Sequence, residues 1–311
     1  MKPKEINRKR ILLSPLNWGM GHVARCIGLI HQLKEQGNTL FIACSTEQKA
    51  VFEQYFDDLT YINHAGYPFH FGGKGRFGLD LANKSSSLFR RLKQEREQTE
   101  VMVEENTIDL VLSDHRYGFR STKVTSILIT HQVNLPVRLH EALINELHKK
   151  YLSRFDRIWV MDYADCRLSG KLSTSKRTNL DFIGPYSRFS LYTNRPEKKY
   201  DNVLIASGPK VYAQQLIDEV INSKNVSLLD GLVIIHGEDM RIPDGVEAVS
   251  VDWRKQDDII LKAKHLISRA GYSTIMDCEE LSVTATFIAT PGQREQEYLQ
   301  ERHQKDKVSS T

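Results

Sequence analysis

Short apolar runs that alternate with amphipathic stretches are the feature that most constrains the fold of this 311-residue chain. The runs of the first half are RILLSPL, NTLFIAC, LTYIN, IDLVLSD, SILITHQ and RIWVMD, and each predicts a strand. Residues 22–36 and 87–105, which lie between such runs, carry apolar side chains at helical spacing. Strands that alternate with helices pair in parallel, so we expect an α/β sheet with helices on both faces.

The same alternation begins again after a polar segment. Residues 185–201 lack periodicity, which indicates a linker. Beyond it, strands are predicted for NVLIASG, GLVIIHG, EAVSVD, KHLISRAG and TATFIAT. We therefore predict two Rossmann-like domains, residues 1–184 and 202–311, with the active site in the interdomain cleft at the carboxyl ends of both sheets.

Composition excludes several classes of protein. The formal net charge of +4 is dispersed along the chain, which argues against a dedicated nucleic-acid binder. The sequence contains no apolar run of about 18 residues, the length that a membrane-spanning helix needs. The four cysteines have no CxxC spacing, as is typical of reduced thiols. These features together predict a cytoplasmic protein.

The turn after the first predicted strand reads SPLNWGMGHVARC. Gly19, Gly21 and Ala24 satisfy the G-x-G-x-x-G/A pattern of dinucleotide-binding proteins. The second predicted strand, however, ends without the acidic residue that would bind a ribose, so a dinucleotide site is not favoured. We instead expect the glycines to permit a sharp turn that leaves His22 at the start of a helix.

His22 is the candidate general base, since a neutral imidazole can accept a proton from a hydroxyl group. Asp114 ends the fourth predicted strand at the same sheet edge and would hold the imidazole in one tautomer. His131 follows the next strand and is expected to line the same site, whereas His115 is expected to be peripheral. The alternatives are that His22 only satisfies a backbone group of its helix and that Asp114 only caps a turn.

Two neighbouring stretches carry further hypotheses. Residues 64–86 are rich in glycine and aromatic residues and too long for an ordinary connection, so they predict either a binding loop or a surface loop without a role. Residues 87–96 interleave basic side chains with Leu and Phe. That pattern suits a peripheral contact with an anionic membrane, but it is also the ordinary pattern of an amphipathic helix that packs on its own sheet.

The second half contains a strand, a glycine turn and a helix start in LISRAGYSTIMD. Backbone amides after Gly271 and the hydroxyls of Ser273 and Thr274 could hold a diphosphate at the positive end of the helix dipole. Arg269 would add positive charge, and Asp277, one turn further, could accept hydrogen bonds from a ribose. In the later motif TPGQREQEYL, a Glu-Gln pair offers groups that could orient a sugar.

The ordered motifs GMGHVAR, SDHRYG, THQ, SGP, SRAGYSTIMD and TPGQREQEYL resemble the GT-B glycosyltransferases. The resemblance is to the bacterial family with a family 28 type C-terminal domain, which includes the enzyme that adds N-acetylglucosamine to lipid I. It implies a UDP-sugar donor held by the C-terminal domain, a glycan or lipid-linked acceptor held by the N-terminal domain, inversion at the anomeric carbon, and neither metal nor cofactor.

The resemblance also assigns residues. The catalytic pair would be His22 and Asp114, with Gly19, Gly21 and His131 on the acceptor side. The matching donor residues are Ser207, Gly208, Arg269, Gly271, Ser273 and Thr274 for the diphosphate, Asp277 for the ribose, and Gln293, Glu295 and Gln296 for the sugar.

Departures from the family pattern leave other functions open. SGPKVYAQQ lacks an arginine that close relatives have, and the C-terminal domain is expected to be short. GMGHVARC also resembles the nucleotide-sugar hydrolase of pseudaminic acid synthesis, in which water replaces the acceptor. A third reading is a non-catalytic protein that binds a nucleotide sugar without turning it over.

Overall fold

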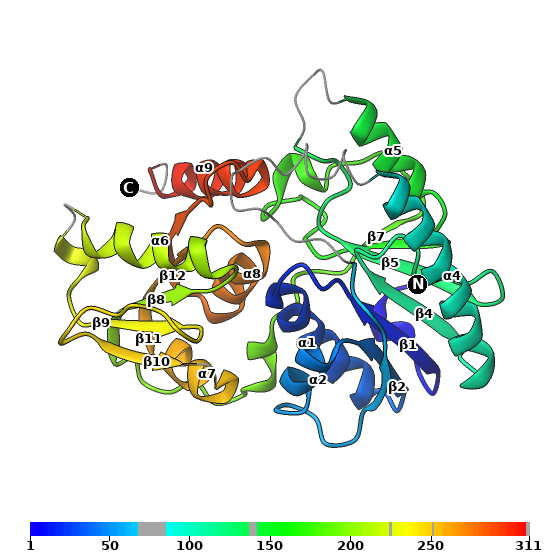
Figure 1. Ribbon diagram of the computed structural model, residues 1–311, viewed down its shortest axis with the longest axis horizontal. Helices are drawn as coiled ribbons and strands as arrows, with labels where there is room; N and C mark the ends of the chain where they lie inside the picture. Colours follow the sequence, from blue (N-terminus) through cyan, green and yellow to red (C-terminus); the bar gives the residue numbers. More distant parts are fainter. Residues whose placement is uncertain (68–84, 137–141, 224–225, 251, 309–311) are drawn as a thin grey trace. The chain divides into compact units, whose positions relative to one another are not determined.

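The computed structural model divides into two compact α/β units (Figure 1). The first unit ends at Arg188 and the second begins at Phe189, within the predicted linker 185–201. The structure describes residues 1–67, 85–136, 142–223, 226–250 and 252–308. Most of the predicted binding loop, residues 68–84, therefore lies outside the described residues.

The first unit contains a seven-stranded parallel sheet in the order β3-β2-β1-β4-β5-β6-β7. Its strands are β1 (Arg10–Pro15), β2 (Thr39–Cys44), β3 (Thr60–Asn63), β4 (Leu110–Asp114), β5 (Thr125–Thr130), β6 (Arg157–Val160) and β7 (Leu180–Phe182). The first six coincide with the predicted apolar runs. Strand β7 was not predicted, because it has only three residues and Asp181 at its centre interrupts any apolar run.

Helices cover both faces of this sheet, with α1 and α2 on one side and α4 on the other (Figure 1). The helical segments are α1 (Met20–Glu35), α2 (Thr46–Phe52), α4 (Ser85–Glu105), α5 (Ala142–Leu152), η1 (Pro3–Glu5) and η3 (Gly170–Leu172). The short η4 (Arg188–Leu191) spans the boundary between the two units. Met102 and Val103 of α4 pack on Leu12 and Val111 of the sheet. Burial of such apolar side chains is the main force that holds the layers together.

The second unit contains a five-stranded parallel sheet in the order β10-β9-β8-β11-β12. Its strands are β8 (Tyr200–Ala206), β9 (Leu232–His236), β10 (Glu247–Ser250), β11 (Ala263–Arg269) and β12 (Thr284–Ile288). Its helical segments are α6 (Lys210–Ile221), α7 (Trp253–Leu261), α8 (Tyr272–Leu281), α9 (Arg294–Val308) and η5 (Val226–Leu228). Helices α6 and α7 lie on opposite faces of the sheet (Figure 1).

Each sheet reverses its strand order once, between β1 and β4 in the first unit and between β8 and β11 in the second. The register pairs Pro15 with Asp114 in the first sheet and Ile205 with Ser268 in the second. Open α/β sheets bind ligands beyond the carboxyl ends of the strands at such a switch point. We therefore expect the loops that follow these four strands to carry the ligand-binding residues.

The predicted α/β class with two parallel sheets is confirmed. Among the described helices, none combines the length and the apolar character that crossing a bilayer requires.

Candidate active site

The glycine turn after β1 places His22 in the first turn of α1. The helix begins after Gly19, whose φ of +145° is a conformation that side chains disfavour. Gly21 lies inside the first helical turn and shows no positive φ, so only Gly19 is needed for the turn. The local sequence thus fixes where the His22 side chain leaves the backbone.

The His22 ring contacts a buried carboxylate. Its Nδ1 lies 2.8 Å from Oδ2 of Asp114, the last residue of β4. Asp114 is fully buried, whereas the His22 side chain is 18% exposed, so one edge of the ring reaches solvent. These contacts differ from both alternatives above, since His22 bonds a side chain and Asp114 bonds other side chains. The predicted pair is brought together, and its catalytic role stays a prediction.

A guanidinium shares the same carboxylate. Arg25, one turn after His22 on α1, donates from Nε to Asp114 Oδ2 at 3.2 Å and from Nη2 to Asp114 Oδ1. Burial by itself opposes ionisation of Asp114, but Arg25 and then His22 hold the pKa of Asp114 well below its usual range. Asp114 is therefore ionised at neutral pH. Sequence reasoning missed Arg25, although its spacing of three residues from His22 places both on one helix face.

His115 belongs to this cluster, so its predicted peripheral position was wrong. Its backbone is left-handed, with φ of +58°, and its ring lies 5.9 Å from the His22 ring and 5.7 Å from the His131 ring. His115 Nε2 lies 2.7 Å from the Thr130 hydroxyl, which accepts from the Gln132 backbone N–H at 2.8 Å. Arg25 Nη2 lies 3.5 Å from His115 Nδ1 and can only donate, which favours the neutral tautomer with the proton on Nε2.

His131 also lies at this edge, where its prediction placed it. It is 5% exposed, and its Nδ1 lies 3.2 Å from Nη1 of Arg25. The ring is thus in contact with the cluster from the loop after β5. Whether it lines an acceptor site stays a prediction.

The electrostatics favour a neutral His22. Burial lowers the pKa of His22, and Arg25 lowers it further, while Asp114 acts in the opposite direction. A neutral imidazole with Nδ1–H directed at Asp114 keeps a lone pair on Nε2. The cluster can therefore accept a proton near neutral pH.

The same donor atoms could be considered for a metal ion. Ligand atoms of His22, Asp114 and His115 lie within 4.8 Å of one another. Arg25 Nη2, however, lies 2.7 Å from His22 Nδ1 and 3.5 Å from His115 Nδ1. A permanent cation already stands among these atoms and would repel a metal ion. We assign no metal here, and the absence of a metal requirement stays a prediction.

The predicted donor residues follow three adjacent strands of the second sheet. Ser207 and Gly208 come after β8, and Gly208 has φ of +95°. Gly271 is the N-cap of α8, which puts Ser273 and Thr274 in its first turn. Gln293 and the Glu-Gln pair follow β12. All lie at the carboxyl edge, as predicted, but no contact tests their roles.

Two predicted donor residues are engaged within the fold. Arg269 is 6% exposed, and its guanidinium donates to the carbonyls of Ala289 at 3.0 Å and Tyr212 at 2.9 Å. Gln296 Oε1 accepts from the backbone N–H of Thr290 at 2.8 Å. Both therefore hold the loop after β12 in place, and Arg269 also joins the end of β11 to the first turn of α6. Direct contact of these two with a ligand stays a prediction.

Asp277 and Glu295 differ in position along their helices. Asp277 lies within α8 and is 6% exposed, while Glu295 lies in the first turn of α9 and is partly exposed. A ribose contact requires the buried Asp277 carboxylate to reach the ligand side of its helix. That role also stays a prediction.

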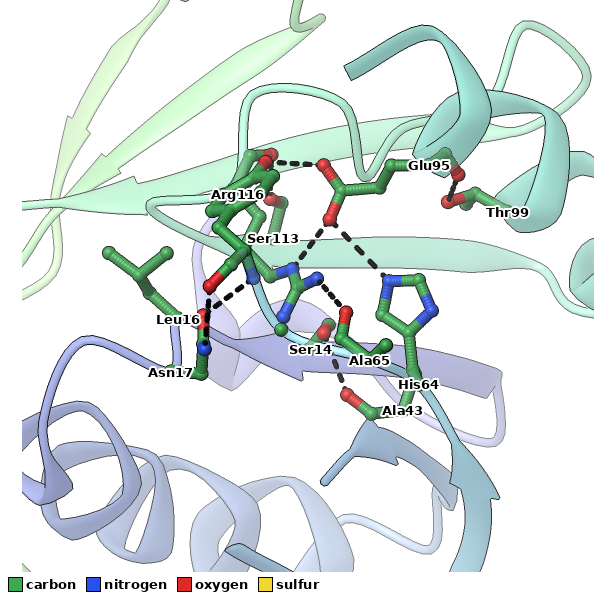
Figure 2. Close-up of polar contacts among 12 residues, drawn as sticks. Ser14, Leu16, Asn17, Ala43, His64, Ala65, Glu95, Thr99, Ser113 and Arg116 are labelled. Carbon is green, nitrogen blue, oxygen red and sulfur yellow. Dashed lines mark hydrogen bonds and ion pairs between the residues drawn. The ribbon is translucent and has the colours of Figure 1, made fainter. Parts of the chain in front are cut away.

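A second charged cluster, which sequence reasoning missed, is fully buried beside the site (Figure 2). Glu95 of α4 accepts from Arg116 Nε at 2.6 Å and lies 3.5 Å from His64 Nε2, and both partners follow strand ends. Tyr67 donates its hydroxyl to Glu95, and Arg116 Nη2 donates to the Ala65 carbonyl at 3.1 Å. This Glu95 cluster joins α4 to the loops after β3 and β4.

Residues 87–96, the stretch proposed to contact a membrane, belong to α4 and include residues on its buried face. Leu92 is 6% exposed and packs with Leu16, Tyr67 and Tyr151. Leu92 therefore faces the fold, as the packing alternative expects. The membrane contact stays a prediction.

A buried histidine outside the candidate site predicts acid sensitivity. His148 Nε2 donates to the Gln132 carbonyl at 3.0 Å, and Tyr117 donates its hydroxyl to Nδ1 at 2.6 Å. Burial lowers the pKa of His148 to about 4. Between that value and the unfolded value near 6.5, the unfolded chain binds the extra proton, so stability falls as pH falls.

Between pH 7 and pH 5, we expect the unfolding free energy of the wild type to fall by about 2 kcal/mol more than that of His148→Gln. Urea unfolding of both proteins at several pH values measures it. Parallel stability curves for the wild type and the variant would contradict the assignment.

Known proteins are similar to this chain in structure rather than in sequence. The sequence matches no family model, and a comparison with curated proteins finds no significant relative. Solved structures are similar at low identity. The glycotransferase of kitacinnamycin is 14% identical, with 94% of this chain and 84% of that chain covered and a TM-score of 0.63. The chain has the GT-B fold.

Two further neighbours were solved with a nucleotide. Spinosyn rhamnosyltransferase SpnG in complex with thymidine diphosphate is 14% identical, with coverage of 97% and 91% and a TM-score of 0.59. Glycosyltransferase SsfS6 from Streptomyces sp. SF2575, also with thymidine diphosphate, is 15% identical, with coverage of 92% and 83% and a TM-score of 0.55.

Proposed function

We propose that this protein is a glycosyltransferase that moves a hexose or N-acetylhexosamine from a UDP-linked donor to a glycan or lipid-linked acceptor. The observation that carries the proposal is the 2.8 Å contact between His22 and the buried Asp114 at the switch point of the first sheet. His22 Nδ1 lies between Asp114 Oδ2, which can only accept, and Arg25 Nη2 at 2.7 Å, which can only donate. The proposal requires the tautomer in which Nδ1–H donates to Asp114, because that tautomer leaves His22 Nε2 as the base.

The reaction is a single displacement. His22 Nε2 takes the proton of the acceptor hydroxyl while its oxygen attacks the anomeric carbon, and the bond from that carbon to the diphosphate oxygen breaks. Attack from the face opposite the leaving nucleoside diphosphate inverts the anomeric configuration. Amides at the start of α8, with Ser273 and Thr274, would stabilise the charge on the diphosphate.

The choice of UDP and of acceptor rests on the motif resemblance to the family that includes the lipid I enzyme. The structural neighbours support nucleotide binding in general, since SpnG and SsfS6 were solved with thymidine diphosphate. UDP and thymidine diphosphate are both pyrimidine nucleoside diphosphates. The experiment below therefore tests which nucleobase and which sugar the donor carries.

A thermal-shift series with UDP, thymidine diphosphate, UDP-N-acetylglucosamine and NADH tests the proposal, because a ligand that binds the native state raises its melting temperature. We expect a rise with UDP and the UDP-sugar. A response to NADH alone would overturn the proposal. Release of free sugar without an acceptor would favour the hydrolase, and binding without turnover would favour a non-catalytic protein.

The donor site makes a quantitative prediction at Asp277. We expect Asp277→Asn to weaken UDP binding by roughly 1–3 kcal/mol, the contribution of a charged hydrogen-bond partner. Calorimetric titration measures it. Asp258→Asn is the matched control, because Asp258 is 59% exposed on α7 and pairs with Lys262. Equal UDP affinity for both variants would remove Asp277 from the donor site.

A further inference from the structure

One buried guanidinium contacts every ionisable ring of the candidate site. Arg25 is 2% exposed, and its terminal nitrogens lie 2.7 Å from His22 Nδ1, 3.2 Å from His131 Nδ1 and 3.5 Å from His115 Nδ1. The same group donates to both carboxylate oxygens of Asp114. No other described cation lies in contact with Asp114.

The charges of the cluster oppose each other. An ionised Asp114 without a partner would favour the protonated form of His22, which cannot act as a base. Arg25 stays protonated at all relevant pH values and offsets that negative charge. Among the residues that the structure describes, the other groups near His22 are His115 and His131 from the loops after β4 and β5, and Cys26, whose Sγ lies 3.8 Å from Asp114 Oδ2. None of these adds negative charge, since burial raises the pKa of Cys26 well above its usual value.

We propose that Arg25 is a positioning residue that keeps His22 neutral and ready to accept a proton. In the tautomer that can act as a base, His22 Nδ1–H donates to Asp114. The positive charge of Arg25 offsets the tendency of that carboxylate to hold a second proton on the ring. The catalytic meaning rests on the proposed function, but the protonation state of His22 does not.

Rings of His115 and His131 support the placement of the guanidinium. Arg25 Nη2 lies 3.5 Å from His115 Nδ1 and can only donate, so Nδ1 is the acceptor in this contact. His131 Nδ1 likewise lies where Arg25 Nη1–H can donate to it. Acceptors on several sides thus hold the planar guanidinium. A lysine at this position would supply the same charge but not the same set of hydrogen bonds.

The test is an NMR titration of the His22 imidazole in the wild type, Arg25→Gln and Arg25→Lys. Gln keeps a hydrogen-bond donor without the charge, and Lys keeps the charge. We expect the wild-type His22 to titrate below 6.5, and its midpoint to rise by about one pH unit or more in Arg25→Gln, because Asp114 then acts on His22 alone. Arg25→Lys should restore most of the wild-type value.

Two further measurements accompany the His22 titration: the titration of His148 as a control for folding, and the pH profile of kcat. His148, on α5, should titrate unchanged in both variants if they fold as the wild type does. In active protein, the acid limb of the kcat profile should move to higher pH by the same amount in Arg25→Gln. If that variant does not fold, the wild type still decides, since a His22 that titrates above 6.5 overturns the proposal. An unchanged or lower His22 midpoint in folded Arg25→Gln would overturn it too. Failure to find any transfer activity would count against the proposed function and leave the titration result standing.

Discussion

His22→Ala is expected to lower kcat about 100-fold or more while the Kd of the nucleotide donor stays unchanged. The imidazole must take the acceptor proton as the new bond forms, and the predicted donor residues all belong to the other unit. Steady-state kinetics with calorimetric donor binding measures both quantities. A loss confined to KM would mean that His22 only contributes to binding.

A histidine on the same helix is the matched control. His31 lies on α1, where its side chain is 37% exposed and 3.5 Å from Glu35. His31→Ala makes the same chemical change away from the site, so its kcat should stay near that of the wild type. Near-normal turnover of His22→Ala would remove this residue from catalysis.

Asp114→Asn should lower kcat less than His22→Ala does, since it removes the charge that orients the imidazole rather than the base itself. The double variant should be little worse than His22→Ala, because residues that act as a unit are non-additive. Additive losses would mean that the two side chains act separately.

Arg116→Met is expected to destabilise the first unit by about 3–5 kcal/mol, since it leaves the Glu95 carboxylate buried without its cation. Arg116 and Glu95 are each 1% exposed. Although burial raises the pKa of Glu95, His64 and Arg116 lower it by more, so the carboxylate is charged in the native state. Denaturant unfolding of the wild type and the variant measures the difference.

The control is the same substitution at a more exposed pair. Arg157 donates to Asp181 at 2.5 and 2.7 Å, but its side chain is 34% exposed. Arg157→Met should therefore cost about 1 kcal/mol or less. Adding Glu95→Gln to Arg116→Met should recover part of the loss, because no unpaired ion then remains. Equal losses for the two Arg→Met variants would contradict the buried charge cluster.

Much of the fold follows from the sequence, because parallel strands buried on both faces give continuous apolar runs. Apolar runs placed β1 to β6 and β8 to β12, whereas β7 has only three residues, with Asp181 at its centre, and gave none. The pairing of His22 with Asp114 also followed from strand ends, since residues after β1 and β4 meet where those neighbouring strands end.

Other parts depend on three-dimensional packing. The residues around His115 do not predict its left-handed backbone, which turns the ring toward the cluster. Glu95 stands in a run of charged residues and reads as solvated, yet it lies three residues after Leu92 and four before Thr99, on the buried face of α4. That spacing was the available signal.

The roles of the donor loops depend on a ligand as well as on the fold. Residues such as Asp277 and Gln296 are positioned by α8 and α9, but their contacts with a sugar nucleotide exist only in a complex. The transfer reaction therefore needs a direct test.

The most direct test is proton NMR of the anomeric configuration as the donor is consumed. With a UDP-sugar and an acceptor, we expect UDP release and a product whose anomeric proton shows the configuration opposite to that of the donor. His22→Ala should abolish this signal while still binding the donor. A product with retained configuration, formed equally well without His22, would contradict direct displacement assisted by this base.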